Sequence, residues 1–168
     1  LVNRHESLRT TFDMVGEELV QIISDNTKVN VEFEECIGAS EAEKAELFSR
    51  FVSPFDLTQG PLLRVGLIKL EENKYILLFD MHHIISDGVS MEILIDEFSK
   101  IYNGKRLEPL RLQYKDYSEW QNNLLKSEKI KKQREYWINE FSDEIPVLNI
   151  PTDYERQAVQ SFEGDSVN

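Results

Sequence analysis

The polar and apolar positions at the start of the chain predict three short strands. Residues 10–14 and 18–24 are rich in apolar and β-branched side chains and lie on either side of Gly16, an arrangement typical of a β-hairpin. Between residues 29 and 34 apolar and polar side chains alternate, which is the pattern of a strand that buries one face.

The pattern then changes from that of a strand to that of a helix. Ser40 and Glu43 have the spacing of a capping box, and apolar side chains follow at helical intervals until Pro54. Because proline lacks an amide hydrogen and clashes with the preceding turn, the pattern predicts a helix over about 40–53.

Two longer apolar runs and three more helices follow. Residues 62–70 and 74–81 are apolar on both faces, which predicts neighbouring central strands covered on each side. A long helix is expected directly after residues 82–88, because apolar side chains recur there every three or four residues. These side chains are Met91, Leu94, Ile95, Phe98, Ile101 and Tyr102. Further helices are predicted at about 113–125 and 128–141.

The order of the elements indicates an α/β protein of the α+β sandwich type. Strands and helices do not alternate strictly, as they do in doubly wound folds, so we predict helices laid on a mixed, largely antiparallel sheet. Residues 145–160 contain two prolines and no periodicity, and we expect them to form a connecting segment. The sequence has no glycine-rich loop of the kinds that bind nucleotides.

Composition narrows the range of partners. The 168 residues include 31 acidic and 19 basic side chains, and the net charge of −12 argues against nucleic acid or an anionic membrane surface as the main partner. The single cysteine allows neither an internal disulfide nor a cysteine-based zinc site, so we expect a reducing, cytoplasmic location. The apolar runs are far shorter than the roughly 20 residues that span a bilayer.

Candidate chemistry is concentrated between the last predicted strand and the longest helix. His82, His83, Asp87 and Gly88 lie there, and they include two of the 3 histidines. Successive strand residues face opposite sides, so one histidine can be reactive while the other is structural, for example through a hydrogen bond with Asp80. A purely structural alternative is that Asp87 caps the helix and Gly88 serves a tight turn. A metal site is disfavoured, because further ligands are missing.

Further motifs occur in the chain in a particular order. They are R-H-E-S-L-R-T-T-F at 4–12, Y-K-D-Y-S-E-W-Q at 114–121, P-T-D-Y at 151–154 and S-F-E-G-D at 161–165. Together with H-H-x-x-x-D-G, they resemble the motifs of condensation domains of non-ribosomal peptide synthetases, which share the fold of chloramphenicol acetyltransferase. The chain departs from the family pattern at Ser118, and Glu155 and Gln157 stand where prolines are usual.

The resemblance implies that residues 1–168 are most of the N-terminal lobe of a two-lobed domain, with 145–168 leading toward the second lobe. The start of this lobe and the whole C-terminal lobe would then belong to a longer chain. The channel of these domains lies between the two lobes, so we expect the isolated fragment to be inactive.

The resemblance also implies an activity, which is peptide-bond formation between a donor thioester and the amine of an aminoacyl thioester. Both substrates would be carried on phosphopantetheine arms, and the lobe itself would bind no cofactor. The partners would be the donor and acceptor carrier proteins, the C-terminal lobe and the adjacent adenylation domain.

Individual roles follow from the same resemblance. His83 would be the catalytic residue, which positions the amine or accepts its proton, and Asp87 would pair with Arg4 to hold the histidine loop. A free α-amine has a pKa of about 7.7–8, so proton removal is needed mainly as the new bond forms. An epimerization domain is one alternative, although such domains typically carry tryptophan at the position of Met91. A catalytically degenerate carrier-binding module is the other.

Two remaining patterns have simpler explanations. Tyr114, Tyr117 and Trp120 recur every three residues, and we predict that this aromatic stripe packs in the core. Basic side chains concentrate between residues 126 and 134, where they form a solvated helix face or a docking surface for an acidic carrier protein.

Overall fold

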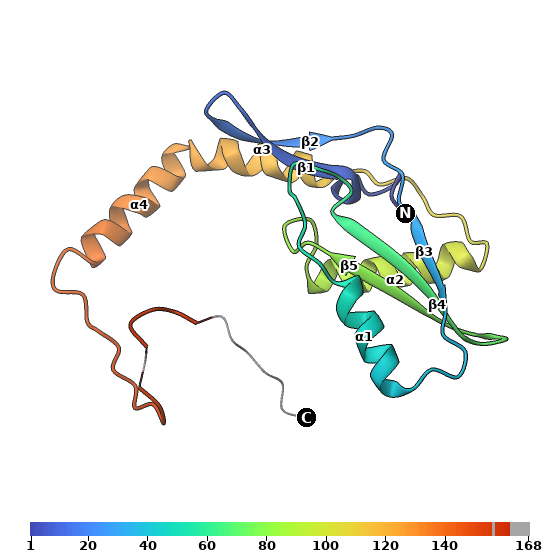
Figure 1. Ribbon diagram of the computed structural model, residues 1–168. Helices are drawn as coiled ribbons and strands as arrows, with labels where there is room; N and C mark the ends of the chain where they lie inside the picture. Colours follow the sequence, from blue (N-terminus) through green and yellow to red (C-terminus); the bar gives the residue numbers. More distant parts are fainter. Residues whose placement is uncertain (156, 162–168) are drawn as a thin grey trace. The chain divides into compact units, whose positions relative to one another are not determined.

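The computed structural model describes residues 1–155 and 157–161 (Figure 1). By its contacts the chain forms two units, residues 1–121 and the residues from Asn122 onward. The predicted connecting segment has neither a helix nor a strand in its described part, as expected. Most of the motif at 161–165 lies outside the described residues.

The first two strands form the predicted hairpin. β1 (Thr10–Val15) pairs antiparallel with β2 (Glu18–Ile23) in a two-stranded sheet. Gly16 in the turn has a φ of 67°, which falls in the left-handed region where glycine is strongly favoured. The amide of Phe12 donates to the carbonyl of Leu57 at 2.8 Å, so the hairpin is bonded to the loop that precedes β4.

A second sheet has the strand order β3-β4-β5. β3 (Val31–Glu35) runs parallel to β4 (Leu63–Glu71), and β4 runs antiparallel to β5 (Lys74–Met81). The predicted mixed, largely antiparallel arrangement is therefore confirmed, but the strands are divided between two sheets.

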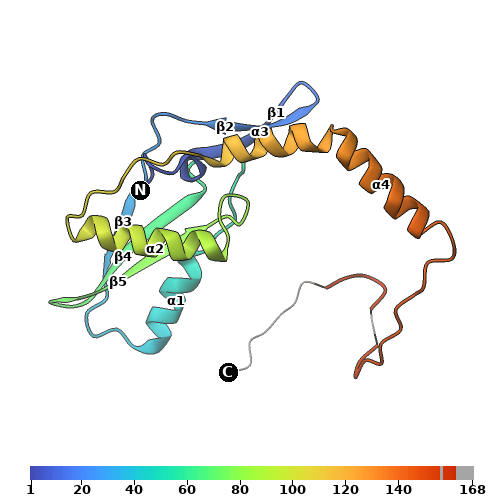
Figure 2. The ribbon, with the colours of Figure 1, turned by 180° about the vertical axis from the view of Figure 1, so that it is seen from behind.

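Helices lie on both faces of the larger sheet (Figures 1 and 2). α1 (Glu41–Phe51) begins at Ser40 with the predicted capping box. A Cβ atom on Gly66 would lie 2.9 Å from the ring of Phe51, so glycine at this position of β4 lets α1 approach the sheet closely. α2 (Gly88–Tyr102) lies over the opposite face.

The prediction of two central, fully covered strands is correct for β4 and wrong for β5. In the described part of the chain, β5 is the last strand of its sheet. The side chains of Tyr75 and Phe79 are 47% and 40% exposed. An apolar cavity of about 530 Å³ lies between the sheet and α2, so the helix does not fill the space over the strand.

The buried core holds the turn that follows β5. Leu8 of the 3-10 helix η1 (Glu6–Arg9), Leu62, Leu63 and Ile85 form one cluster, and Leu62 is fully buried. Because Ile85 belongs to the turn between β5 and α2, burial of this residue anchors the turn to the sheet.

The last two predicted helices are present as α3 (Tyr114–Leu125) and α4 (Glu128–Glu140). The aromatic stripe on α3 is not core, because its three side chains are about half exposed. Its rings contact one another with centroids 5.7 and 5.6 Å apart, and α3 instead bonds to the hairpin through Ser118 and Gln21. Within the described residues, no helix combines the length and apolar character that crossing a bilayer requires.

Candidate active site

Hydrogen bonds of His82 shape the turn between β5 and α2. Its amide donates to the carbonyl of Leu62 at 3.1 Å, and its ring Nδ1 accepts from the amide of Ile84 at 3.0 Å. An Nδ1 atom that accepts a hydrogen bond carries no proton, so a neutral His82 ring holds its proton on Nε2. The suggested bond between His82 and Asp80 is wrong, because Asp80 pairs with Arg64 of β4.

His83 lies on the exposed side of the same turn. Among the described residues, no hydrogen bond involves its ring, in contrast to that of His82. The His83 side chain lines a cavity of about 460 Å³ whose walls include Ser7 and Thr10, Gln21 of β2 and Tyr114 of α3. Its lining is mixed, with polar side chains such as Gln21 and apolar ones such as Phe12 and Ile84.

A second, smaller cavity also borders the turn. It measures about 370 Å³, and its lining includes Phe79, Met81 and Met91. Three residues line both cavities, namely His83, Ser86 and Asp87. The imidazole of His83 therefore borders two cavities.

Asp87 caps α2, as its position before the helix predicts. Its Oδ1 atom accepts hydrogen bonds from the amide of Ser90 at 2.8 Å and from the Ser90 hydroxyl at 2.7 Å. These bonds hold the pKa of the Asp87 carboxyl below its ordinary value, and nearby His83 contributes in the same direction. Asp87 is therefore an anion at neutral pH and stabilises the first turn of α2.

Gly88 begins α2, and neither its backbone nor its packing requires glycine. Its φ lies outside the left-handed region, and an added Cβ would meet no described atom within 4 Å. The suggested role of Gly88 in a tight turn therefore finds no support in its backbone conformation. Gly88 instead lines the smaller cavity, where the lack of a side chain leaves space beside His83.

The predicted pair between Arg4 and Asp87 is also wrong. Arg4 Nε donates to Glu97 Oε2 at 3.0 Å, and its Nη1 donates to the carbonyl of Glu108. His5 Nε2 lies 2.6 Å from the same Glu97 oxygen. Glu97 lies about 15 Å along α2 from Asp87, at 1.5 Å per residue, so Arg4 contacts the middle of the helix while Asp87 caps its start.

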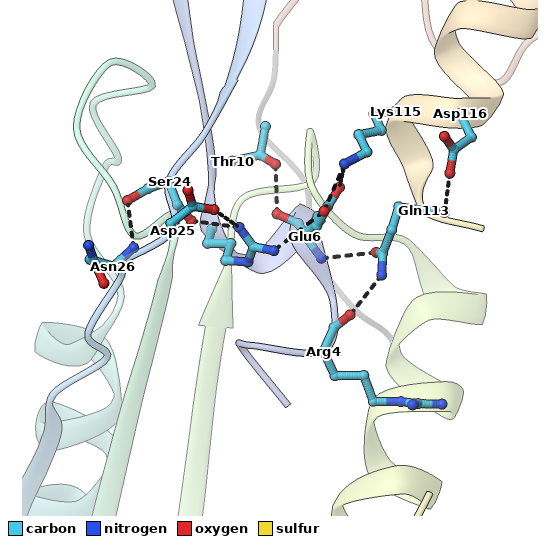
Figure 3. A network of polar contacts seen from close by, with 10 residues as sticks. Arg4, Glu6, Thr10, Ser24, Asp25, Asn26, Gln113, Lys115 and Asp116 are labelled. Atoms are coloured by element: carbon cyan, nitrogen blue, oxygen red, sulfur yellow. Dashed lines mark hydrogen bonds and ion pairs between the residues drawn. The ribbon is translucent and has the colours of Figure 1, made fainter. Parts of the chain in front are cut away.

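Polar contacts join this N-terminal segment to the start of α3 (Figure 3). The Gln113 side chain donates to the carbonyl of Arg4 at 2.9 Å and accepts from the amide of Glu6 at 3.1 Å. Lys115 donates to the Glu6 carboxylate at 2.9 Å, and the Thr10 hydroxyl donates to the Glu6 carbonyl at 2.7 Å. These contacts hold the segments that contribute Ser7, Thr10 and Tyr114 to the lining of the cavity of about 460 Å³, here called the larger cavity of the histidine turn.

The whole chain, residues 1–168, matches the family model described as "Condensation domain". The chain belongs to this family. It is 51% identical over 167 residues to surfactin synthase subunit 1 of Bacillus subtilis (strain 168), covering 99% of this chain and 5% of the relative. It is 50% identical over 167 residues to gramicidin S synthase 2 of Aneurinibacillus migulanus, covering 99% of this chain and 4% of the relative.

Solved structures agree with this assignment. The chain resembles the X-domain in its complex with OxyB from teicoplanin biosynthesis, with a TM-score of 0.77 and 30% identity over 94% of this chain and 36% of that one. It also has the fold of the epimerization domain from the third module of tyrocidine synthetase B, with a TM-score of 0.76 and 24% identity over 92% of this chain and 37% of that one. The chloramphenicol acetyltransferase-like fold expected for a condensation domain is thus confirmed.

Some residues that build the site of this condensation domain have weak signals in the sequence. Glu97 is 9% exposed, and its one clue is that an acidic side chain interrupts the apolar stripe of α2. Burial alone raises the pKa of the Glu97 carboxyl, but hydrogen bonds from Arg4 and His5 outweigh burial and lower it. Gln21 and Tyr114 come near His83 only through the tertiary fold, which local patterns do not reveal.

In the part of the chain that the structure describes, no cluster of three or more histidine, cysteine or acidic side chains is placed to hold a metal ion. The turn from His82 to Gly88, its two cavities and the polar network beside them make up the candidate active site.

Proposed function

We propose that this condensation domain joins a donor acyl or peptidyl thioester to the amine of an acceptor aminoacyl thioester. Both substrates are held by phosphopantetheine arms of carrier proteins, and the complete enzyme includes the C-terminal lobe and the adjacent adenylation domain. The observation that carries the proposal is the position of His83, an imidazole that borders two cavities and has no hydrogen bond in the described part of the chain. The relatives are peptide antibiotic synthetases many times longer than this chain.

The proposed reaction needs one group that handles a proton. The acceptor nitrogen attacks the thioester carbonyl, a carbon–nitrogen bond forms, and the carbon–sulfur bond breaks. The nitrogen loses one proton, and the departing thiolate of the donor arm gains one. His83 accepts the proton from nitrogen or orients the amine as the tetrahedral adduct forms, and an imidazole at neutral pH suits either task.

The other motif residues act on the position of His83. His82 holds the turn through the amide of Ile84, and Asp87 holds the first turn of α2. Arg4 fixes the segment that forms the wall of the larger cavity. In this proposal His82, Asp87 and Arg4 are positioning residues, and Gly88 provides space for a substrate.

The test is single-turnover peptide transfer between two loaded carriers in the intact synthetase that contains this chain. We expect His83→Ala to lower the rate constant by about 10²- to 10⁴-fold, the usual contribution of a positioned acid or base, with an unchanged melting temperature. His5→Gln is the matched control, because it alters a histidine bonded to Glu97. We expect this variant to lose rate only to the extent that its melting temperature also falls. Undiminished transfer by His83→Ala would contradict the proposal.

The same preparation distinguishes peptide transfer from epimerization. With the donor carrier loaded and the acceptor empty, a condensation domain leaves the configuration of the bound residue unchanged. If the wild-type protein inverts the configuration of that residue and His83→Ala does not, the site would instead be assigned an epimerization activity.

A further inference from the structure

A cluster of charged and aromatic side chains lies beside the histidine turn and is not explained by the motif residues. Arg64 of β4 is the register partner of Asp80 of β5, and their side chains form an ion pair. The same guanidinium donates to the carbonyls of Ser53 at 2.7 Å and Pro54 at 2.9 Å. One side chain therefore ties the loop after α1 to the neighbouring strands β4 and β5 of the larger sheet.

The cluster reaches the turn through Phe55. The guanidinium carbon of Arg64 lies 3.7 Å from the centre of the Phe55 ring, a cation–π contact. The rings of Phe55 and His82 also make an edge-to-face contact, with their centroids 6.2 Å apart and an interplanar angle of 83°. Phe55 is thus held on one side by Arg64 and limits the movement of the His82 ring on the other.

The orientation of the His82 ring in turn decides the shape of the turn. Nδ1 of His82 accepts the amide of Ile84, and this bond spans His83 in the chain. Rotation of the His82 ring would leave that amide without its acceptor and let the backbone of His83 move. A displacement of about 1 Å in a reacting group can cost roughly 100-fold in rate.

We infer that Arg64 is a positioning residue for peptide transfer, which acts on His83 through Phe55 and His82. This inference rests on the proposed role of His83. Arginine suits the task because its planar fork binds a carboxylate and two carbonyls at once while its face stacks on a ring. Lysine has the charge but offers neither the fork nor the flat face, so it should not replace arginine here.

The test compares Arg64→Ala and Arg64→Lys with wild type in single-turnover transfer by the intact, preloaded synthetase. We expect both variants to lower the rate constant by about 10- to 100-fold. Arg50→Ala is the matched control, because Arg50 of α1 also pairs with a carboxylate, that of Glu34, but at an exposed position away from both cavities. Its rate should equal that of wild type.

Chemical rescue separates positioning from a general loss of stability. Millimolar guanidinium chloride should restore at least part of the rate of Arg64→Ala, because the free ion can occupy the space between Asp80 and Phe55, whereas equal sodium chloride should not. Failure of guanidinium to restore the rate, together with a lowered melting temperature, would overturn the inference and assign Arg64 a role in folding alone.

The outcomes for the two proposals can be told apart. Loss of transfer in His83→Ala combined with a wild-type rate in Arg64→Ala would overturn the role of Arg64 and leave the proposed function intact. A wild-type rate in His83→Ala would contradict the proposed function itself, whatever Arg64 does.

Discussion

Two histidines in this chain lie in opposite environments. His5 lies 2.6 Å from a carboxylate oxygen of Glu97, and its side chain is 16% exposed. His83 is exposed, borders two cavities and has no hydrogen bond in the described part of the chain. The comparison shows that the ring of His5 holds elements of the fold together, whereas the ring of His83 makes no hydrogen bond among the described residues, as its proposed role requires.

The two histidine environments are connected through α2. Glu97 in the middle of the helix binds His5 and Arg4, while Asp87 at its start lies four residues after His83. Changes in the middle of α2 should therefore act mainly on stability, and changes in the turn before it should act mainly on the rate of transfer. The variants below test the part of this division that concerns stability.

The largest effect on stability is expected from Glu97→Ala. Removing a buried carboxylate leaves Arg4 without its charged partner, so we expect the free energy of unfolding to fall by about 2–3 kcal/mol. This loss is smaller than that for a fully buried pair, because Arg4 is partly exposed. Hydrogen exchange of the α2 amides in the intact protein measures the free energy of local opening. Asp96→Ala is the control, since Asp96 forms an exposed pair with Lys100. Equal effects of both variants would contradict a special role for the buried cluster.

The same carboxylate predicts a dependence of stability on acid. The pKa of Glu97 in the folded protein is lowered from 4.5, so the unfolded chain binds its proton first as the pH falls. The stabilisation is complete above about pH 4.5 and is lost progressively below that value, as the pH passes through the lowered folded pKa. Opening of α2 measured by hydrogen exchange between neutral pH and the acid limit should show this loss in wild type and lack it in Glu97→Gln. Identical acid profiles would refute the assignment.

The smallest effect on stability is expected from Asp87→Ala. The helix loses its cap, but Arg4 keeps its bonds to Glu97, so the melting temperature should fall by less than in Glu97→Ala. Asp87→Ser provides a side-chain oxygen that can still cap and should retain most of the wild-type melting temperature. A loss as large as that of Glu97→Ala would instead show that Asp87 and Arg4 depend on each other.

Local features of the fold were predictable from the sequence, and long-range pairs were not. Ser40 predicts a helix start and Gly16 predicts a turn, because the interactions that determine these features involve only residues close in the sequence. The partner of Arg4 is 93 residues away, and α2 offers three acidic side chains, Glu92, Asp96 and Glu97, besides its N-cap Asp87. Position along the helix decides between them, and a one-dimensional pattern does not contain this information.

The exposure of apolar side chains was the other feature that could not be predicted. The apolar pattern of 74–81 and the aromatic stripe of α3 both indicate buried side chains, because a pattern reports which faces are apolar. Burial also requires another element to cover that face. At the candidate site, by contrast, motif and structure agree that the histidines, Asp87 and Gly88 lie together in one turn between β5 and α2.

The loop between α1 and β4 has a consequence for how the chain can change in length. It is bonded to β1 at Leu57, where a carbonyl accepts the amide of Phe12, and two of its earlier carbonyls bind Arg64. Surface loops usually accept insertions and deletions. Here one added residue would have to displace either the hairpin wall of the larger cavity or the Phe55 ring beside His82. We therefore expect the geometry of the candidate active site to depend on the number of residues in this loop.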